Sequence, residues 1–149
     1  MKVVPITDEL LAASESVHRQ LRPHIPKDYV GRMKEILAAG GEMAVALVDG
    51  KVAGITVFRM VERTFTGREM YCDDLVTDAT QRSTGVGHAL MEYMIGLATE
   101  RKCDFFTLDS GCQRQQAHKF YFREGLTITS FHFTRQLSQG VPISERVRV

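Results

Sequence analysis

The stretch Gln81–Leu90, with the sequence QRSTGVGHAL, places an arginine and two closely spaced glycines directly before a run of helix-forming residues. A strand-like segment, Tyr71–Val76, precedes it. After it, apolar residues recur at intervals of three and four, which predicts an amphipathic helix. Backbone N–H groups at the start of a helix form a ready site for a phosphate or pyrophosphate. Glycine lets the main chain approach such an anion because it has no Cβ. We therefore predict that an anion binds over residues 82–88.

The composition is that of an ordinary globular protein. The 149 residues are enough for one domain with a substantial core, and we expect a single domain over residues 1–149. A net charge of +1 and scattered Lys and Arg residues give no reason to expect nucleic acid or a membrane as a partner. The amino terminus lacks the apolar stretch of a signal peptide, and no later stretch is long enough to span a membrane. We therefore expect a cytoplasmic protein.

The cysteines and histidines give no sign of a metal site. Cys72, Cys103 and Cys112 are odd in number and lack the C-x-x-C spacing, so neither a disulfide framework nor a zinc site is predicted. The histidines His18, His24, His118 and His132 show no ligand spacing, and we expect the first two to be surface or packing residues. We expect no metal.

The part of the chain before the glycine stretch predicts a strand, two helices and three antiparallel strands. The strand covers residues 2–6, and Thr7 or Asp8 caps the first helix. The second helix follows Pro26 and ends at Gly40 and Gly41. Three strands then cover residues 43–48, 52–61 and 70–77, with an Asp-Gly hairpin turn at 49–50 and a polar loop at 62–69. Gly54, inside the second of these strands, predicts a bulge or a close approach of another backbone.

The part after the glycine stretch predicts a parallel crossover. An apolar run over 105–108 follows the helix, and a strand–helix–strand order implies parallel pairing. A further helix covers residues 113–124 and stops at Gly125, a final strand alternates over 126–137, and residues 138–149 form a loosely held tail. The predicted fold class is mixed α/β, of α+β-like character. It combines an antiparallel meander, a parallel crossover and a C-terminal strand.

Two motifs resemble one known family. Arg82-Ser83-Thr84-Gly85-Val86-Gly87 matches the pattern Q/R-x-x-G-x-G/A of the GCN5-related N-acetyltransferase (GNAT) superfamily. The segment AHKFYFREGL, residues 117–126, is similar to the closing A-x-x-F-Y-x-x-x-G-F signature of that family, with Leu126 where Phe is usual. The resemblance covers residues 43–137. It implies a GNAT-type fold, binding of acetyl-CoA, and transfer of the acetyl group to a primary amine of a small-molecule or peptide acceptor.

The resemblance also assigns a site for acetyl-CoA. The glycine loop would hold the pyrophosphate, and the strand before it would pair with the pantetheine arm. A backbone N–H near Val76 would polarise the thioester carbonyl. The implied cofactor-binding residues are Leu75, Val76, Thr77, Arg82, Ser83, Thr84, Gly85, Val86, Gly87 and His88. Many relatives carry asparagine before the last helix, where this chain has Arg114.

Catalysis needs an acid for the leaving thiolate and a base for the amine. A thiol has a pKa of about 8.5 and a tyrosine a pKa of about 10, so a positioned phenol can protonate the departing thiolate. Tyr121 matches the tyrosine of the family motif and is the predicted general acid. Asp73 and Asp109 are the candidate carboxylates, ahead of Asp74. Asp73 and Asp74 occupy successive strand positions and are expected to point to opposite faces. An acidic pocket for a cationic amine, formed by Glu62, Glu69, Asp73 and Asp109, is a further hypothesis.

Two other functions compete with acetyl transfer. A non-catalytic acyl-CoA-binding sensor or interaction module would need the same glycines but none of the catalytic side chains. A dinucleotide-binding oxidoreductase would use Gly85 and Gly87 as G-x-G, but Leu90 stands where its third glycine is required. A homodimer is compatible with the exposed strand edges that such a sheet leaves. The acceptor amine is not determined by the sequence.

Overall fold

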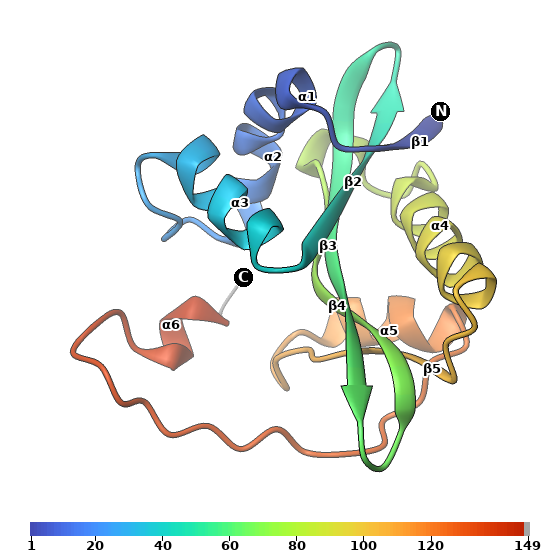
Figure 1. The fold of residues 1–149 in the computed structure, drawn as a ribbon. Helices are drawn as coiled ribbons and strands as arrows, with labels where there is room; N and C mark the ends of the chain where they lie inside the picture. The colour runs from blue at the N-terminus through green and yellow to red at the C-terminus, as the bar shows by residue number, and fades with distance from the viewer. Residues whose placement is uncertain (148–149) are drawn as a thin grey trace. The chain divides into compact units, whose positions relative to one another are not determined.

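The computed structural model describes residues 1–147, which form two compact units, Met1–Leu108 and a second unit that begins at Asp109. The first unit holds one five-stranded sheet with strand order β1-β2-β3-β4-β5. Neighbours from β1 to β4 are antiparallel, whereas β4 and β5 are parallel. The mixed α/β class and the order of meander and crossover are therefore confirmed for this unit (Figure 1).

Most predicted elements of the first unit are present at nearly the predicted positions. The strands are β1 (Lys2–Pro5), β2 (Gly41–Val48), β3 (Lys51–Arg63), β4 (Gly67–Thr77) and β5 (Phe105–Leu108). The Asp-Gly turn is a hairpin with positive φ at both positions, 49° at Asp49 and 75° at Gly50. The predicted loop 62–69 is too long, because β3 and β4 pair as far as Arg63 and Gly67.

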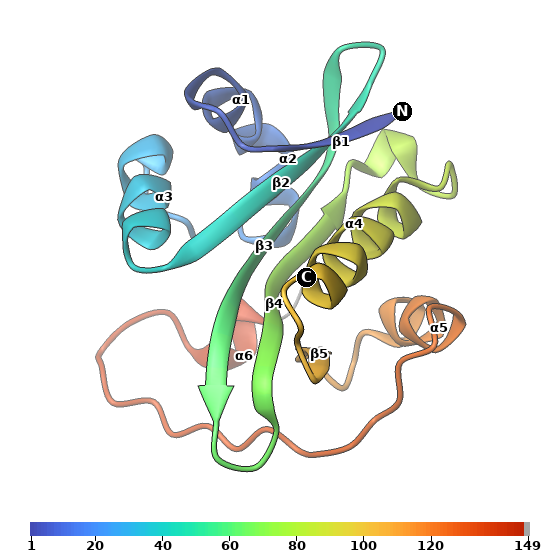
Figure 2. The same cartoon turned by 45° about the vertical axis from the view of Figure 1, so that its right-hand side comes forward.

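The helices cover both faces of the sheet, as the two views in Figures 1 and 2 show. One face carries α1 (Asp8–Ala13), α2 (Glu15–Leu21) and α3 (Tyr29–Ala38), and the other carries α4 (Val86–Glu100). Thr7 caps α1 as predicted, with its hydroxyl accepting the Leu10 N–H. The single helix that we predicted before Pro23 is broken at Ser14, whose hydroxyl donates to the Leu10 carbonyl at 2.7 Å.

Two apolar clusters hold these layers together. The larger one joins α1–α3 to β2 and β3, and its buried residues are Leu11, Val17, Tyr29, Met33, Met43, Val45, Ile55 and Val57. The smaller one lies under the start of α4 and contains Ala46, Ala53, Val86 and Leu90. Because Val86 is the first helical residue after the glycine turn, burial of its side chain anchors that turn to the sheet.

The second unit contains α5 (Gln115–Arg123) and α6 (Ile143–Arg146). Gly125, with φ of 83°, follows α5 as predicted. The predicted strand over 126–137 is wrong, because none of these residues pairs in a strand, and all but Leu126 are exposed. The predicted tail contains the short helix α6, and its last two residues lie outside the described part of the chain. Among residues 1–147, no helix has both the length and the apolar character needed to cross a bilayer.

Candidate active site

The central feature of the first unit is an open edge on β4. This strand pairs with β3 along its whole length, from Gly67 to Thr77. It pairs with β5 only from Glu69 to Cys72. Within the described residues, the side of β4 that faces away from β3 therefore has no neighbouring strand over 73–77. Backbone groups on such an edge can pair with an extended ligand.

A β-bulge marks the start of this open edge. Val57 pairs with Asp74 and Phe58 pairs with Cys72, so Asp73 is the extra residue on β4. The bulge interrupts the strict alternation on which we based opposite orientations for Asp73 and Asp74. The two carboxylates have different partners, since Asp73 binds Arg59 of β3 whereas Asp74 binds Arg22 and His18, and their opposite orientation stays a prediction.

The open edge leads directly into the glycine turn. Asp78 caps a short 3-10 helix, η1 (Ala79–Gln81), by accepting the Thr80 N–H at 2.8 Å. In the turn that follows, Ser83 and Gly85 adopt left-handed conformations, with φ of 63° and 88°. When a right-handed residue is followed by a left-handed one, their N–H groups can point toward the same place, and an anion can bind there. The predicted strand, turn and helix are confirmed, and the bound anion stays a prediction.

The start of α4 has the geometry expected of an anion site. Gly85 is its N-cap residue, and the first bond of the helix runs from the Ala89 N–H to the Gly85 carbonyl at 2.9 Å. The N–H groups of the preceding helical residues point out of the helix end. The loop residues Arg82–Gly85 and His88 are exposed, so a ligand can reach them.

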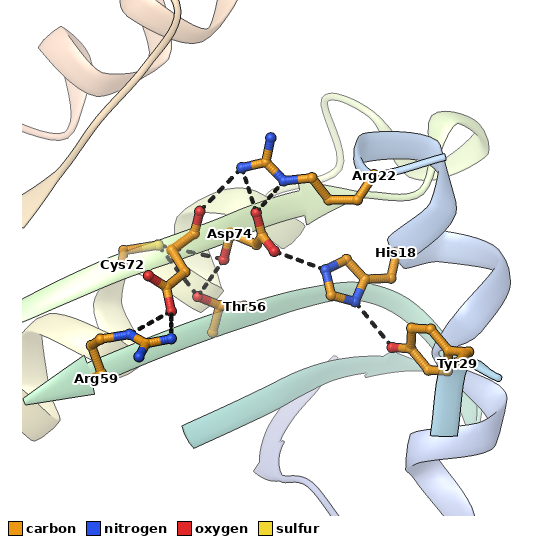
Figure 3. Close-up of polar contacts among 8 residues, drawn as sticks. His18, Arg22, Tyr29, Thr56, Arg59, Cys72 and Asp74 are labelled. Carbon is orange, nitrogen blue, oxygen red and sulfur yellow. Dashed lines mark hydrogen bonds and ion pairs between the residues drawn. The ribbon is translucent and has the colours of Figure 1, made fainter. Parts of the chain in front are cut away.

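Two carboxylates at the bulge each have a basic partner (Figure 3). Asp73 accepts from Arg59 Nε at 2.8 Å and from Nη2 at 2.5 Å. Asp74 accepts from Arg22 Nε at 2.6 Å and from His18 Nε2 at 2.9 Å. Burial alone would raise the pKa of Asp74, but the His18 hydrogen bond and the Arg22 charge together hold it below its ordinary value. Asp74 is thus an ionised carboxylate that is largely shielded from solvent.

The hypothesis of an acidic pocket is not supported by these contacts. Glu69 is buried and accepts from Thr107 at 2.6 Å, from Thr66 at 2.8 Å and from Arg63 at 3.2 Å. Burial would raise the pKa of Glu69, but these three partners lower it. Glu62 lies 3.9 Å from Arg68. Like Asp73, these two carboxylates have their charges matched by arginines of the same sheet.

The second unit carries the remaining predicted catalytic residues. Tyr121 lies half-buried on α5, with its ring in an edge contact with Phe120 at 5.6 Å between centroids. Asp109 is exposed and lies 3.0 Å from His132 Nδ1. Arg114 is the N-cap residue of α5. The catalytic roles of Tyr121 and Asp109 stay predictions.

Sequence analysis missed the contribution of α2 and α3 to the site. His18, expected at the surface or in packing, is buried and bonds both Asp74 and the Tyr29 hydroxyl. One signal was present, since His18 and Arg22 are four residues apart and share one helix face. Their common partner Asp74 lies more than fifty positions later in the sequence, where no spacing rule reaches.

Comparison with known proteins assigns the family. A model of the acetyltransferase (GNAT) family matches residues 7–125, and the chain therefore belongs to this family. It is also similar to an uncharacterised N-acetyltransferase, YhdJ, of Bacillus subtilis strain 168, with 40% identity over 70 residues. That match covers 46% of this chain and 49% of the relative, so it spans about half of the relative's length.

Solved structures support the same fold. An aminoglycoside N-acetyltransferase, AAC(6′)-Iy, in complex with CoA has a TM-score of 0.82 at 18% identity, covering 91% of this chain and 93% of that one. A ribosomal-protein-alanine N-acetyltransferase from Brucella melitensis biovar Abortus 2308 has a TM-score of 0.79 at 16% identity, covering 92% of this chain and 100% of that one. At this identity the likeness concerns the fold.

Proposed function

We propose that the protein is an acetyl-CoA-dependent N-acetyltransferase that moves the acetyl group directly onto a primary amine of a small-molecule or peptide acceptor. One observation carries this proposal: the open edge of β4 over 73–77 is followed, after the short helix η1, by the glycine turn at the start of α4. The extended pantetheine arm of acetyl-CoA needs a strand edge with free backbone groups, and its pyrophosphate needs a helix N-terminus placed after that edge.

Acetyl-CoA would bind along this path. The backbone groups of Leu75, Val76 and Thr77 pair with the pantetheine amides. The turn from Arg82 to His88 supplies N–H groups for the pyrophosphate, with the dipole of α4 favouring the negative charge. A backbone N–H near Val76 polarises the thioester carbonyl and stabilises the tetrahedral intermediate.

In the transfer step the acceptor nitrogen loses two protons and the leaving sulfur gains one. The acceptor ammonium gives a proton to Asp73 or Asp109, directly or through water, and the free amine attacks the thioester carbon. A C–N bond forms, and the acceptor nitrogen gives its second proton to water. The C–S bond then breaks as Tyr121 gives its phenolic proton to the departing thiolate, and water returns a proton to the phenolate. Asp73 is the better supported carboxylate, since it lies on the bulge that begins the open edge.

The decisive experiment combines binding with turnover. Isothermal titration calorimetry should show binding of acetyl-CoA and none of NAD. Release of CoA thiol should then be measured across a panel of amines that includes aminoglycosides and alanine-containing peptides, since structural neighbours are named for aminoglycosides and for ribosomal-protein alanine. Binding of NAD in place of acetyl-CoA would overturn the proposal. Binding of acetyl-CoA without thiol release for any amine would favour the non-catalytic sensor.

We also propose a homodimer in which residues 126–137 of one copy add to the sheet edge of a second copy. The segment has the alternation of a strand and exposes large apolar side chains: Ile128 (69%), Phe131 (85%), Phe133 (92%) and Leu137 (91%). The strand β5 has only β4 as a neighbour within residues 1–147. Light scattering should show a dimer that the double variant Phe131→Ser/Phe133→Ser abolishes and the control Thr129→Ala retains. A monomeric wild-type protein would contradict the dimer.

The cytoplasm remains the proposed compartment. Cys72, Cys103 and Cys112 are all free thiols, which a reducing environment maintains. Fractionation of the native host, with the protein detected by antibody, tests this location.

A further inference from the structure

Three side chains, two from β3 and one from the C-terminal end of α2, hold the bulge that begins the open edge of β4 (Figure 3). Arg22, the residue that directly follows α2, donates to the Asp73 carbonyl at 3.4 Å. Thr56 of β3 donates to the Asp74 carbonyl at 3.0 Å. Arg59 of β3 binds the Asp73 carboxylate. Since a bulge lacks part of its ladder bonding, these contacts determine the direction in which the next backbone groups point.

The Asp74 carboxylate depends on two different partners. Its Oδ1 accepts from Arg22 and its Oδ2 accepts from His18. The side chain is only 14% exposed, so loss of either partner would leave a charged oxygen with little access to water. Binding at both oxygens also stops rotation of the carboxylate. His18 therefore keeps Asp74 in place for Arg22, and Arg22 in turn holds the Asp73 carbonyl.

Tyr29 fixes the protonation pattern of His18. An ionised carboxylate can only accept, so Nε2 of His18 must carry the hydrogen that bonds to Asp74. In the neutral ring, Nδ1 is then an acceptor, and the Tyr29 hydroxyl lies 3.0 Å from it. Burial raises the pKa of Tyr29, which keeps this hydroxyl protonated and able to donate. When the ring is neutral, the hydrogens thus run in one direction, from Tyr29 through His18 to Asp74.

The Tyr29 end of this chain of bonds does not lead to solvent. Tyr29 and His18 are each 1% exposed, and Tyr29 packs in the main core with Leu11 and Met33. A path for protons would have to end at water, but this one ends in the apolar core. The arrangement suits the fixing of a geometry and not the conduction of protons.

We propose that His18 is a positioning residue for acetyl-CoA. His18 is oriented by its hydrogen bond with Tyr29, and it keeps the Asp74 carboxylate in contact with Arg22. These contacts fix the bulge at which the proposed ligand-binding edge of β4 begins. The inference rests on the proposed function, because acetyl-CoA is the ligand that we propose for the open edge. His18 does not touch the ligand in this scheme and acts through Asp74 and Arg22.

The test compares three variants with the wild-type protein. His18→Leu removes both hydrogen bonds, whereas His18→Gln retains an amide donor for Asp74. Ser14→Ala is the matched control, since Ser14 is a buried polar residue that directly precedes α2 and bonds only the Leu10 carbonyl through its hydroxyl. We expect His18→Leu to raise the Kd for acetyl-CoA by about tenfold, and the other two variants to stay within about threefold. Amide hydrogen exchange over 73–77 should become faster in His18→Leu alone.

The outcomes separate the inference from the proposed function. If the wild-type protein binds acetyl-CoA and His18→Leu binds it equally well, the positioning role is overturned. If the wild-type protein does not bind acetyl-CoA, the proposed function fails, and the exchange rates over 73–77 still test the role of His18.

Should His18→Leu not fold, ring ¹⁵N spectroscopy of the wild type and of Tyr29→Phe takes its place. The wild type should show the Nε2–H tautomer alone, and Tyr29→Phe should show a mixture together with faster exchange over 73–77. An Nδ1–H tautomer in the wild type would overturn the network.

Discussion

Gly54 on β3 lies so close beneath the start of α4 that a Cβ added to it would be 2.6 Å from Val86 Cγ1. The same Cβ would lie 3.0 Å from Leu90 Cδ1 and 3.0 Å from the Val76 carbonyl oxygen. The close approach predicted for this glycine is confirmed, and the sheet register also shifts beside it. Because Val86 immediately follows the glycine turn, the absence of a side chain at position 54 sets how closely that turn approaches β4.

We expect Gly54→Ala to destabilise the protein by about 1–3 kcal/mol, the usual range for overpacking a tight site. It should also weaken acetyl-CoA binding, since α4 must move away from the sheet. Denaturant unfolding and calorimetric titration measure the two effects. The control is Gly96→Ala on the exposed side of α4, where nothing lies within 4 Å of the added Cβ. That substitution should stabilise the helix by up to about 1 kcal/mol. Equal stability of the two variants would contradict the packing argument.

Tyr121→Phe should lower kcat by about a hundredfold and leave the Kd for acetyl-CoA nearly unchanged, because a general acid acts only as the thiolate departs. The assay is thiol release with an accepted amine. Tyr93→Phe makes the same change on α4 and should retain full kcat. An unaltered kcat in Tyr121→Phe would assign the tyrosine to packing against Phe120.

Gly87→Glu should weaken CoA binding severely, because it places bulk and negative charge in the first turn of α4, where the pyrophosphate is proposed to bind. Calorimetric titration with CoA measures the loss. Gly96→Glu adds the same charge to an exposed position of the same helix and should bind CoA as the wild type does. Retained affinity in Gly87→Glu would show that the turn does not hold the pyrophosphate.

The three thiols should differ sharply in reactivity. Burial raises the pKa of Cys72 to about 12, so its thiolate fraction at pH 8 is negligible and grows only as the pH approaches that value. Cys112 is exposed, whereas Cys103 is half-buried and has its pKa raised by burial. At pH 8 a disulfide reagent should modify Cys112 first, Cys103 more slowly, and Cys72 only after unfolding. Mass spectrometry of the labelled peptides identifies the order. Rapid labelling of Cys72 in the folded protein would contradict it.

The parts of the fold that depend on neighbours in sequence were predictable. The Asp49-Gly50 turn requires positive φ at both positions, and the strands on either side follow from it. The apolar run over 105–108 became β5 with the predicted bounds. The glycine turn and the start of α4 were likewise visible, because the turn and cap chemistry of these residues is local.

The parts that depend on distant partners were not predictable. The bulge at Asp73 lies in the pairing of β4 with β3, where the pairing of β4 with β5 ends, and no property of Asp73 itself indicates it. The network around His18 joins α2, α3 and β4 across more than fifty positions. The strand predicted from the alternation over 126–137 was wrong, because a strand also needs a partner, and local pattern supplies none.

The pairing of carboxylates with arginines along β3 and β4 has a consequence for how the acceptor arrives. Glu62, Glu69 and Asp73 each lie next to an arginine guanidinium. Each of these ion pairs is neutral as a whole, so this part of the sheet has no net negative potential at long range. An approaching ammonium ion gains little from electrostatic steering by such a surface. The encounter rate with a cationic acceptor should therefore change little with ionic strength, and discrimination among amines would fall to shape and hydrogen bonding at close range.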